Sequence, residues 1–200
     1  MTRALFRLVP ISFALAASAA WAVTAGTVAP DFAVADAAGK TVRLSDFKGK
    51  FVVLEWTNPE CPFVRAQYGA ETMQALQKEA GAKDVVWLSI NSTNQSSSEY
   101  KTGAQMSQWM KDRGAAQKDI LIDGTSDTGR AYDAKTTPHM FVIDPSGRIV
   151  YAGAIDDKRS ARESDRKSAN NYVRAALDEA TAGKPVSVAN TTPYGCSVKY

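Results

Sequence analysis

Apolar residues along this chain form short runs separated by polar segments, and their spacing predicts alternating strands and helices. Three runs are almost wholly apolar, as is typical of strands buried on both faces. They cover residues 51–56, 85–90 and 120–122. Two further runs, 140–143 and 148–151, flank the turn sequence Asp-Pro-Ser-Gly and predict a hairpin. Another short pair, 32–35 and 41–44, predicts a leading hairpin.

The segments between these strands carry apolar residues at helical spacing and predict helices. They cover residues 62–80, 98–113, 128–132 and 164–182. Pro62 suits the first position of a helix, and Gly183 suits the residue that follows the last one. This order predicts an α/β fold in which helices cover a central sheet, with an N-terminal β-hairpin as an extension.

The first residues have the pattern of a secretory signal peptide. Arg3 and Arg7 lie before an apolar stretch. That stretch ends in Ala-Trp-Ala, which has the small-residue pattern of a signal-peptidase cleavage site. The stretch is shorter than the roughly 20 residues that a membrane-spanning helix needs. We therefore predict a periplasmic or secreted protein with no stable membrane anchor after cleavage. The predicted parts are a signal peptide at 1–22, one domain at 23–183 and a tail at 184–200.

The composition removes several classes of function. Of the 200 residues, 44% are hydrophobic and 22% charged, which is enough apolar material for one core. The 24 basic and 21 acidic residues give a net charge of +3 without a basic block, so nucleic acid is not an expected partner. One histidine and two distant cysteines cannot form the usual four-ligand zinc site. We expect no bound metal and no organic cofactor.

Cys61 is the main candidate for chemistry. It follows the predicted strand 51–56 and directly precedes Pro62, so it lies at the start of a predicted helix. Peptide dipoles and free N–H groups at a helix start favour the thiolate, which is the nucleophilic form. We therefore expect a reactive cysteine, and the alternative is an inert buried one. In an oxidising compartment two cysteines can also form a disulfide.

Five segments carry a family resemblance. They are residues 26–32, 36–40, 44–50, 51–56 and 137–144. Together they resemble the thioredoxin superfamily, and more narrowly its alkyl hydroperoxide reductase and thiol-specific antioxidant branch, including exported peroxiredoxin-like redoxins. The resemblance covers about residues 26 to 156. It implies a thioredoxin fold with a central mixed sheet, and it places Cys61 in the attacking position.

The chain departs from two patterns of this superfamily. Val64 stands where the second cysteine of Cys-x-x-Cys belongs, so exchange through a local dithiol is impossible. The peroxidase pattern asks for Thr or Ser three residues before the thiol and for proline further upstream. Asn58 and Leu54 stand at those two positions. Any resolving thiol must therefore come from elsewhere.

The resemblance adds further candidate residues. Glu55 falls where thioredoxins carry a buried proton-relay carboxylate, and burial in an apolar strand would raise its pKa and suit acid–base work. The alternative is a partly exposed acid paired with Lys48 or Lys50.

Thr137 and Pro138 match the family's cis-proline loop, which implies that they lie against Cys61 and bind substrate. His139, the one histidine, follows and is a candidate for substrate, thiolate or metal binding. The alternative for His139 is simple packing at the start of a strand.

Cys196 lies in the C-terminal tail within Thr-Pro-Tyr-Gly-Cys. Such tails are usually disordered. Our hypothesis is that this one folds back, so that Cys196 resolves a sulfenate or mixed disulfide on Cys61. The alternative is an incidental or separately paired cysteine, because sequence does not fix the Cα separation of roughly 4.4–6.8 Å that a disulfide needs.

These features predict an exported thiol-disulfide oxidoreductase or peroxiredoxin-like antioxidant enzyme. The Cys61 thiolate attacks a protein or small-molecule disulfide or a peroxide, and Cys196 or an external thiol reductant regenerates it. Disulfide exchange and peroxide reduction both stay open. Two other classes are a redox-inert module that binds a peptide strand at the cis-proline groove, and a copper(I) carrier. The carrier's ligands would be Cys61, Met140, Cys196 and His139.

Overall fold

The computed structural model describes residues 23–200, so the predicted signal peptide at 1–22 lies outside the described residues. A five-stranded sheet in the order β5-β4-β3-β7-β8 forms the centre. Its strands are β3 (Val52–Trp56), β4 (Val86–Asn91), β5 (Asp119–Ile122), β7 (His139–Ile143) and β8 (Ile149–Gly153). β3, β4 and β5 run parallel, whereas β7 is antiparallel to both β3 and β8. The predicted mixed sheet is confirmed.

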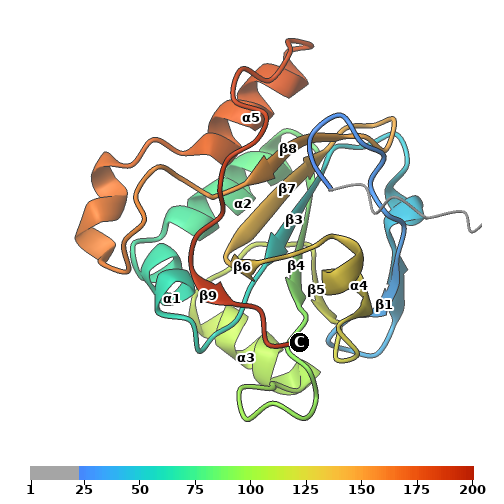
Figure 1. Cartoon of the computed structure of the whole chain (residues 1–200), viewed down its shortest axis with the longest axis vertical. Coiled ribbons are helices and arrows are strands. Elements are labelled where there is room, and N and C mark those ends of the chain that lie inside the picture. The colour runs from blue at the N-terminus through green and yellow to red at the C-terminus, as the bar shows by residue number, and fades with distance from the viewer. Residues whose placement is uncertain (1–22) are drawn as a thin grey trace, which may run out of the picture.

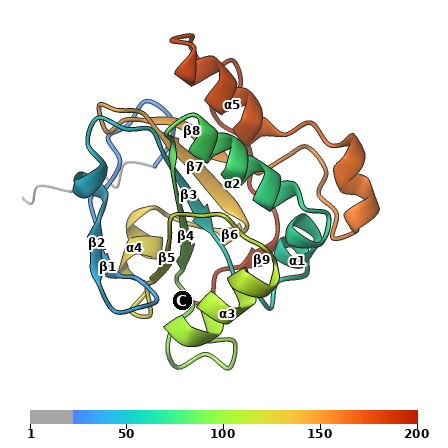
Figure 2. The ribbon, with the colours of Figure 1, turned by 180° about the vertical axis from the view of Figure 1, so that it is seen from behind.

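Each face of the sheet is covered by its own layer. One core cluster is built from the sheet and four helices, which are α1 (Pro62–Gly69), α2 (Thr72–Ala82), α3 (Gly103–Asp112) and α5 (Tyr172–Thr181). On the other face lie the hairpin of β1 (Ala33–Ala35) and β2 (Thr41–Arg43) and the segment around α4 (Asp127–Ala131). Figures 1 and 2 show α1, α2 and α5 on one side of the strands and the hairpin with α4 on the other. The predicted N-terminal hairpin is therefore confirmed. No helix of residues 23–200 has the length and apolar character needed to cross a membrane.

The central strand β3 is buried at all five positions. Its side chains alternate between the two faces, as pleating requires. Leu54 and Trp56 belong to the cluster under the hairpin, whereas Val53 belongs to the cluster under the helices. The alternation therefore turns Glu55 toward the helices, which is also the face of Cys61.

The helix predicted over 62–80 is in fact two helices. α1 ends at Gly69 and α2 begins at Thr72. Between them Glu71 has a φ of 58°, in the left-handed region. A right-handed helix cannot continue through such a residue, and the apolar spacing on either side gives no sign of it.

Two other helices begin later than predicted, and each begins at a capping side chain. The segment 164–182 is divided into a short 3-10 helix, η2 (Glu163–Ser168), and α5. The Asn171 side chain caps α5 by accepting from the Arg174 N–H at 2.9 Å. The segment 98–113 becomes helical only at Gly103, after Thr102 caps it. A second 3-10 helix, η1 (Leu44–Phe47), follows the hairpin.

The C-terminal tail packs against the domain instead of leaving it. Its strand β9 (Cys196–Ser197) pairs antiparallel with β6 (Thr136–Thr137), and Cys196 lies opposite Thr137. Figure 1 shows β9 beside β6, next to α1. Gly195 has a φ of 137°, and a Cβ there would lie 2.0 Å from the Thr137 carbonyl oxygen. Only glycine lets the tail approach this closely.

Gly195→Ala is expected to lift β9 off β6. The new Cβ would meet a backbone oxygen, which cannot move aside as a flexible side chain can. Backbone strain of this kind costs about 1–3 kcal/mol, so amide protons of residues 194–198 should exchange roughly tenfold faster or more. Hydrogen–deuterium exchange measures this.

Gly183→Ala is the matched control. Gly183 also has a positive φ, of 72°, but no atom lies within 4 Å of its added Cβ. In this control the tail should exchange at the wild-type rate. Equal exchange in the two variants would contradict a steric requirement at Gly195.

Candidate active site

Cys61 is placed by the loop that leaves β3 and by the start of α1. It is the N-cap residue of α1, with Pro62 in the first helical turn, so the predicted helix start is confirmed. The Cys61 N–H donates to the Asn58 carbonyl oxygen at 3.0 Å. The Asn58 side chain in turn accepts from the Glu60 N–H at 2.8 Å. These short-range bonds fix the thiol in a site where Cys61 is only 1% exposed.

The cis-proline loop lies against this thiol. The Thr137-Pro138 peptide bond is cis, as the resemblance implied. The Cys61 thiol donates to the Thr137 carbonyl oxygen, with 2.9 Å between Sγ and oxygen. Thr137 is 3% exposed, so this contact is shielded from water.

Cys196 reaches the same place from the far end of the chain. Cys61 binds the carbonyl of Thr137, and Cys196 is the strand partner of that same residue. Cys196 is half-buried against the core cluster that contains Cys61, and both cysteines are free thiols. Burial first, and then the neighbouring Cys61 thiol, raise the pKa of Cys196 to about 12. The structure therefore brings the two cysteines together in their reduced form.

Glu55 lies at the centre of a buried polar cluster under the helices. Its carboxylate accepts from the Tyr68 hydroxyl at 3.0 Å, the Trp87 indole at 2.9 Å and the Ser89 hydroxyl at 2.9 Å. Burial raises the pKa of Glu55, and the hydrogen bonds from Trp87, Ser89 and Tyr68 offset part of that rise. None of these donors carries a positive charge, so the carboxyl keeps its proton above the pH at which an exposed glutamate loses it.

The alternative placement of Glu55, beside a surface lysine, is wrong. Glu55 is 0% exposed. Lys50 instead pairs with Asp84 at 2.9 Å on the surface. None of the hydrogen bonds described for residues 23–200 joins Glu55 directly to a thiol. The link between them is α1, which carries Tyr68 and begins after Cys61.

His139 is not brought to the thiols. Alternation along β7 turns Met140 toward the cluster that contains Cys61. His139 faces the other way and packs against Phe141 with the rings tilted, at 4.5 Å between ring centroids. Burial lowers the pKa of His139 to about 4, so the ring is neutral at physiological pH.

This placement also breaks up the copper(I) ligand set. Cys61, Cys196 and Met140 pack in or against one core cluster, but the fourth ligand, His139, lies across the sheet. Within residues 23–200 no group of three or more His, Cys, Asp or Glu side chains is arranged to hold a metal ion.

Sequence reasoning missed two kinds of residue at this site. Tyr68 and Trp87 are two of the donors that satisfy Glu55. A buried indole N–H usually finds an acceptor, so Trp87 on a buried strand was a usable signal. Gly195 and Tyr194 hold the tail, and their roles depend on contacts with distant segments. The Tyr-Gly-Cys sequence shows a turn signal but not its partners.

Residues 25–152 match the model of the AhpC/TSA family. The chain belongs to the AhpC/TSA family. Among curated proteins it is similar to the thiol-disulfide oxidoreductase ResA of Bacillus subtilis (strain 168). The two are 24% identical over 128 residues, which cover 64% of this chain and 66% of that protein. ResA of Geobacillus kaustophilus (strain HTA426) is 26% identical over 129 residues, which cover 64% of this chain and 68% of that protein. The chain thus spans about two thirds of the length of these relatives.

Solved structures give the same fold. An uncharacterized conserved protein from Geobacillus kaustophilus matches with a TM-score of 0.77 and 29% identity, covering 89% of this chain and 93% of its own. A hypothetical protein from Sinorhizobium meliloti 1021 matches with a TM-score of 0.76 and 26% identity, covering 89% of this chain and 95% of its own. A putative thiol:disulfide interchange protein DsbE from Chlorobium tepidum matches with a TM-score of 0.54 and 28% identity, covering 65% of this chain and 84% of its own. The fold is a thioredoxin fold, and the relatives support a thiol-based redox function.

The Trp87 indole is expected to report the ionisation of Glu55. The indole N–H donates to Glu55, and its NMR signal should shift when the carboxyl loses its proton. Because burial raises the pKa of Glu55, the midpoint should lie above the ordinary value of 4.5. Glu55→Gln should abolish the shift. The Trp56 indole, which donates to Ser92 at 3.0 Å and not to Glu55, is the internal control, because its pH dependence should be the same in Glu55→Gln and in the wild type.

The same group should affect stability with a defined sign. A carboxyl whose pKa is raised by folding contributes stability below its unfolded pKa and loses it as the pH rises through the folded pKa. Relative to Glu55→Gln, the wild-type free energy of unfolding should therefore fall with rising pH, by at most about 1.4 kcal/mol per pH unit. An indole midpoint at or below 4.5 would contradict both expectations.

Alkylation of Cys196 is expected to be slow at neutral pH and to depend on Cys61. With the pKa of Cys196 raised to about 12, little thiolate is present at pH 8. Cys61→Ser removes the neighbouring thiol but leaves the burial. The midpoint for iodoacetamide labelling should therefore fall while staying above the ordinary value of 9.0. Mass spectrometry of the labelled peptide measures this, and an unchanged midpoint would show that the thiols do not interact.

Proposed function

We propose that this protein is a thiol-disulfide oxidoreductase in which Cys61 is the nucleophile and Cys196 is the resolving thiol. The observation that carries the proposal is the pairing of β9 with β6. It puts Cys196 opposite Thr137, whose carbonyl accepts from the Cys61 thiol. The chain has no local second cysteine, since Val64 stands at that position. The tail supplies the thiol that the helix start lacks.

The chemistry then runs in two steps. The Cys61 thiolate attacks one sulfur of a substrate disulfide, which forms a mixed disulfide and releases the other sulfur as a thiolate. Cys196 loses its proton and attacks the Cys61 sulfur, which breaks the mixed disulfide and releases the second substrate thiolate. The substrate disulfide is reduced to two thiols, and Cys61 and Cys196 are oxidised to one disulfide. An external thiol reductant restores both cysteines.

The groups around the Cys61 sulfur favour a disulfide over a peroxide as the substrate. Asn58 stands where peroxidases of this kind carry Thr or Ser, and its side chain is used within the loop. It accepts from the Glu60 N–H and donates to Glu99 at 2.9 Å. Leu54 stands where they carry proline, and it is buried in the cluster on the opposite face of the sheet.

The other site residues take supporting roles in this proposal. The Thr137 carbonyl accepts a hydrogen bond from the Cys61 thiol. The backbone of Thr137 and Pro138 offers the edge along which an extended substrate lies once β9 moves away from β6. Glu55 is the acid–base group beneath α1 in this proposal, because burial raises its pKa and a raised pKa suits proton exchange. His139 has a structural part, because its ring faces the other side of the sheet.

We also propose that the protein works outside the cytoplasm. The support is the signal-peptide pattern at residues 1–22. An oxidising compartment would supply disulfide substrates and would make a dedicated thiol reductant necessary.

Non-reducing peptide mapping tests the proposed function. After treatment with a peptide disulfide, the wild-type chain should contain a Cys61–Cys196 bridge. Cys196→Ser should instead accumulate the mixed disulfide on Cys61, because no resolving thiol remains. Cys61→Ser should react more slowly than the wild type at pH 7, because Cys196 is protonated there.

Two outcomes would count against it. A wild-type chain that never forms the 61–196 bridge would remove Cys196 as the resolving thiol. If hydrogen peroxide oxidises Cys61 much faster than it oxidises free cysteine, the substrate is a peroxide rather than a disulfide.

A further inference from the structure

A second buried polar network lies beneath the tail and takes no part in the proposed chemistry. Asp156 follows β8, and Arg166 lies in η2. Their side chains form an ion pair at 2.7 Å, and each is only 1% exposed. Arg166 also donates to the carbonyls of Lys158 and Ser160 at 2.8 and 3.0 Å. Burying two charges is costly unless hydrogen bonds satisfy them, and here most of the available positions are filled.

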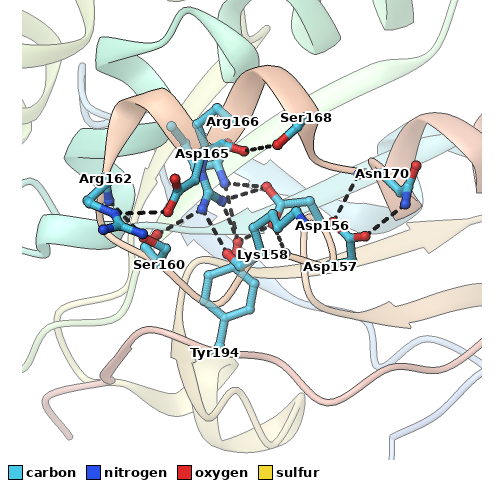
Figure 3. A network of polar contacts seen from close by, with 11 residues as sticks. Asp156, Asp157, Lys158, Ser160, Arg162, Asp165, Arg166, Ser168, Asn170 and Tyr194 are labelled. Atoms are coloured by element: carbon cyan, nitrogen blue, oxygen red, sulfur yellow. Dashed lines mark hydrogen bonds and ion pairs between the residues drawn. The ribbon is translucent and has the colours of Figure 1, made fainter.

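The tail completes this network with one side chain. Tyr194 donates its hydroxyl proton to Asp156 at 2.5 Å and accepts from Arg166 at 2.8 Å. Figure 3 shows the Tyr194 ring below the ion pair, with its hydroxyl pointing toward both partners. Burial, followed by the hydrogen bond to Asp156, raises the pKa of Tyr194, so the hydroxyl keeps its proton and remains a donor.

The same tyrosine also contacts the helix that begins after Cys61. The Tyr194 ring packs edge-on against Phe63 in the first turn of α1, with 5.8 Å between centroids. One turn later on α1, Gln67 donates to Asp156 at 2.7 Å and lies 3.4 Å from the Tyr194 hydroxyl. One side chain therefore ties the tail to the helix that Cys61 caps.

The position of Tyr194 in the tail makes this contact important for the thiols. It stands two residues before Cys196, and two residues of extended chain span only about 7 Å. Besides the backbone pairing of β9 with β6, the other side-chain anchors of the tail lie farther from Cys196. Thr191 bonds to Tyr151 at 2.6 Å, and Tyr200 donates to Ala134 at 2.6 Å. Loss of the Tyr194 hydroxyl would leave the tail attached but would loosen it next to the thiol.

We propose that Tyr194, held by Asp156 and Arg166, is the positioning residue that keeps Cys196 beside Cys61. This inference rests on the proposed function, in which Cys196 resolves the mixed disulfide. A held thiol reacts at a high effective concentration because its freedom of movement is already restricted. The network therefore sets how readily the Cys61–Cys196 disulfide forms, although none of its members takes part in bond making or breaking.

The test is the equilibrium between the Cys61–Cys196 disulfide and glutathione in the full chain. Tyr194→Phe keeps the ring on Phe63 but removes the hydroxyl. Since a hydrogen bond to a charged group affects an equilibrium by roughly tenfold or more, the effective concentration of Cys196 should fall about tenfold. Gln67→Met removes the donor that α1 provides to Asp156 and should also lower the effective concentration of Cys196.

Tyr132→Phe is the matched control. Tyr132 is also buried, and its hydroxyl donates to the Pro30 carbonyl at 2.7 Å and not to the Asp156–Arg166 pair. It should leave the disulfide equilibrium within about twofold of the wild type. Thermal unfolding of the reduced proteins verifies that each variant is folded. A merely structural role for Tyr194 would lower the melting temperature without changing the equilibrium.

The outcomes separate the two proposals. A wild-type chain that forms the disulfide, together with Tyr194→Phe and Gln67→Met variants that form it equally well, would overturn the positioning role and leave the proposed function standing. A wild-type chain that forms no such disulfide would overturn both. Reduced formation in these two variants, with Tyr132→Phe unchanged, supports the positioning role.

Discussion

The candidate site depends on a short antiparallel pairing, between β6 and β9. Each strand has two residues, and Thr137 is the residue that connects this pairing to the site. Its carbonyl faces the Cys61 thiol, and its strand partner is Cys196. Without this pairing, Cys196 would belong to a mobile tail, and its approach to Cys61 would cost the entropy of closing a long loop. Gly195 makes the pairing possible because no side chain fits between the tail and Thr137.

Two buried carboxyl groups, Glu55 and Asp156, each accept a hydrogen bond from a side chain of α1, and their surroundings give them different properties. Glu55 accepts only from neutral donors, so burial dominates and its pKa is raised. Asp156 has the guanidinium of Arg166 within 2.7 Å and the Tyr194 hydroxyl within 2.5 Å. A carboxyl whose pKa is raised by burial keeps its proton to a higher pH than an exposed one, whereas a carboxylate paired with a guanidinium suits anchoring. The helix α1, which begins after Cys61, is in contact with both.

The predictions from sequence succeeded where a local pattern determines the outcome. Continuous apolar runs identified the central strands, and Pro62 identified the start of α1. They failed where one residue's backbone decides, as at Glu71, whose left-handed conformation divides the predicted helix. For His139 the sequence left two placements open, near the thiol because it follows Pro138 in the chain, or packed at the start of a strand. The pleat of β7 decides for packing and turns the ring toward Phe141 on the other face.

The amino-acid sequence by itself determined the fold class, the placement of Cys61 after a buried strand and before a helix, and the cis-proline loop. All of these follow from patterns within a few residues, or from motifs of a family whose members share one chain path. Only the tertiary structure decided that Cys196 lies beside Cys61 and that Tyr194 joins Asp156 and Arg166. Strands of two residues and a single hydroxyl in a charged pair have no periodicity to detect, because their stability comes from partners far away in the sequence.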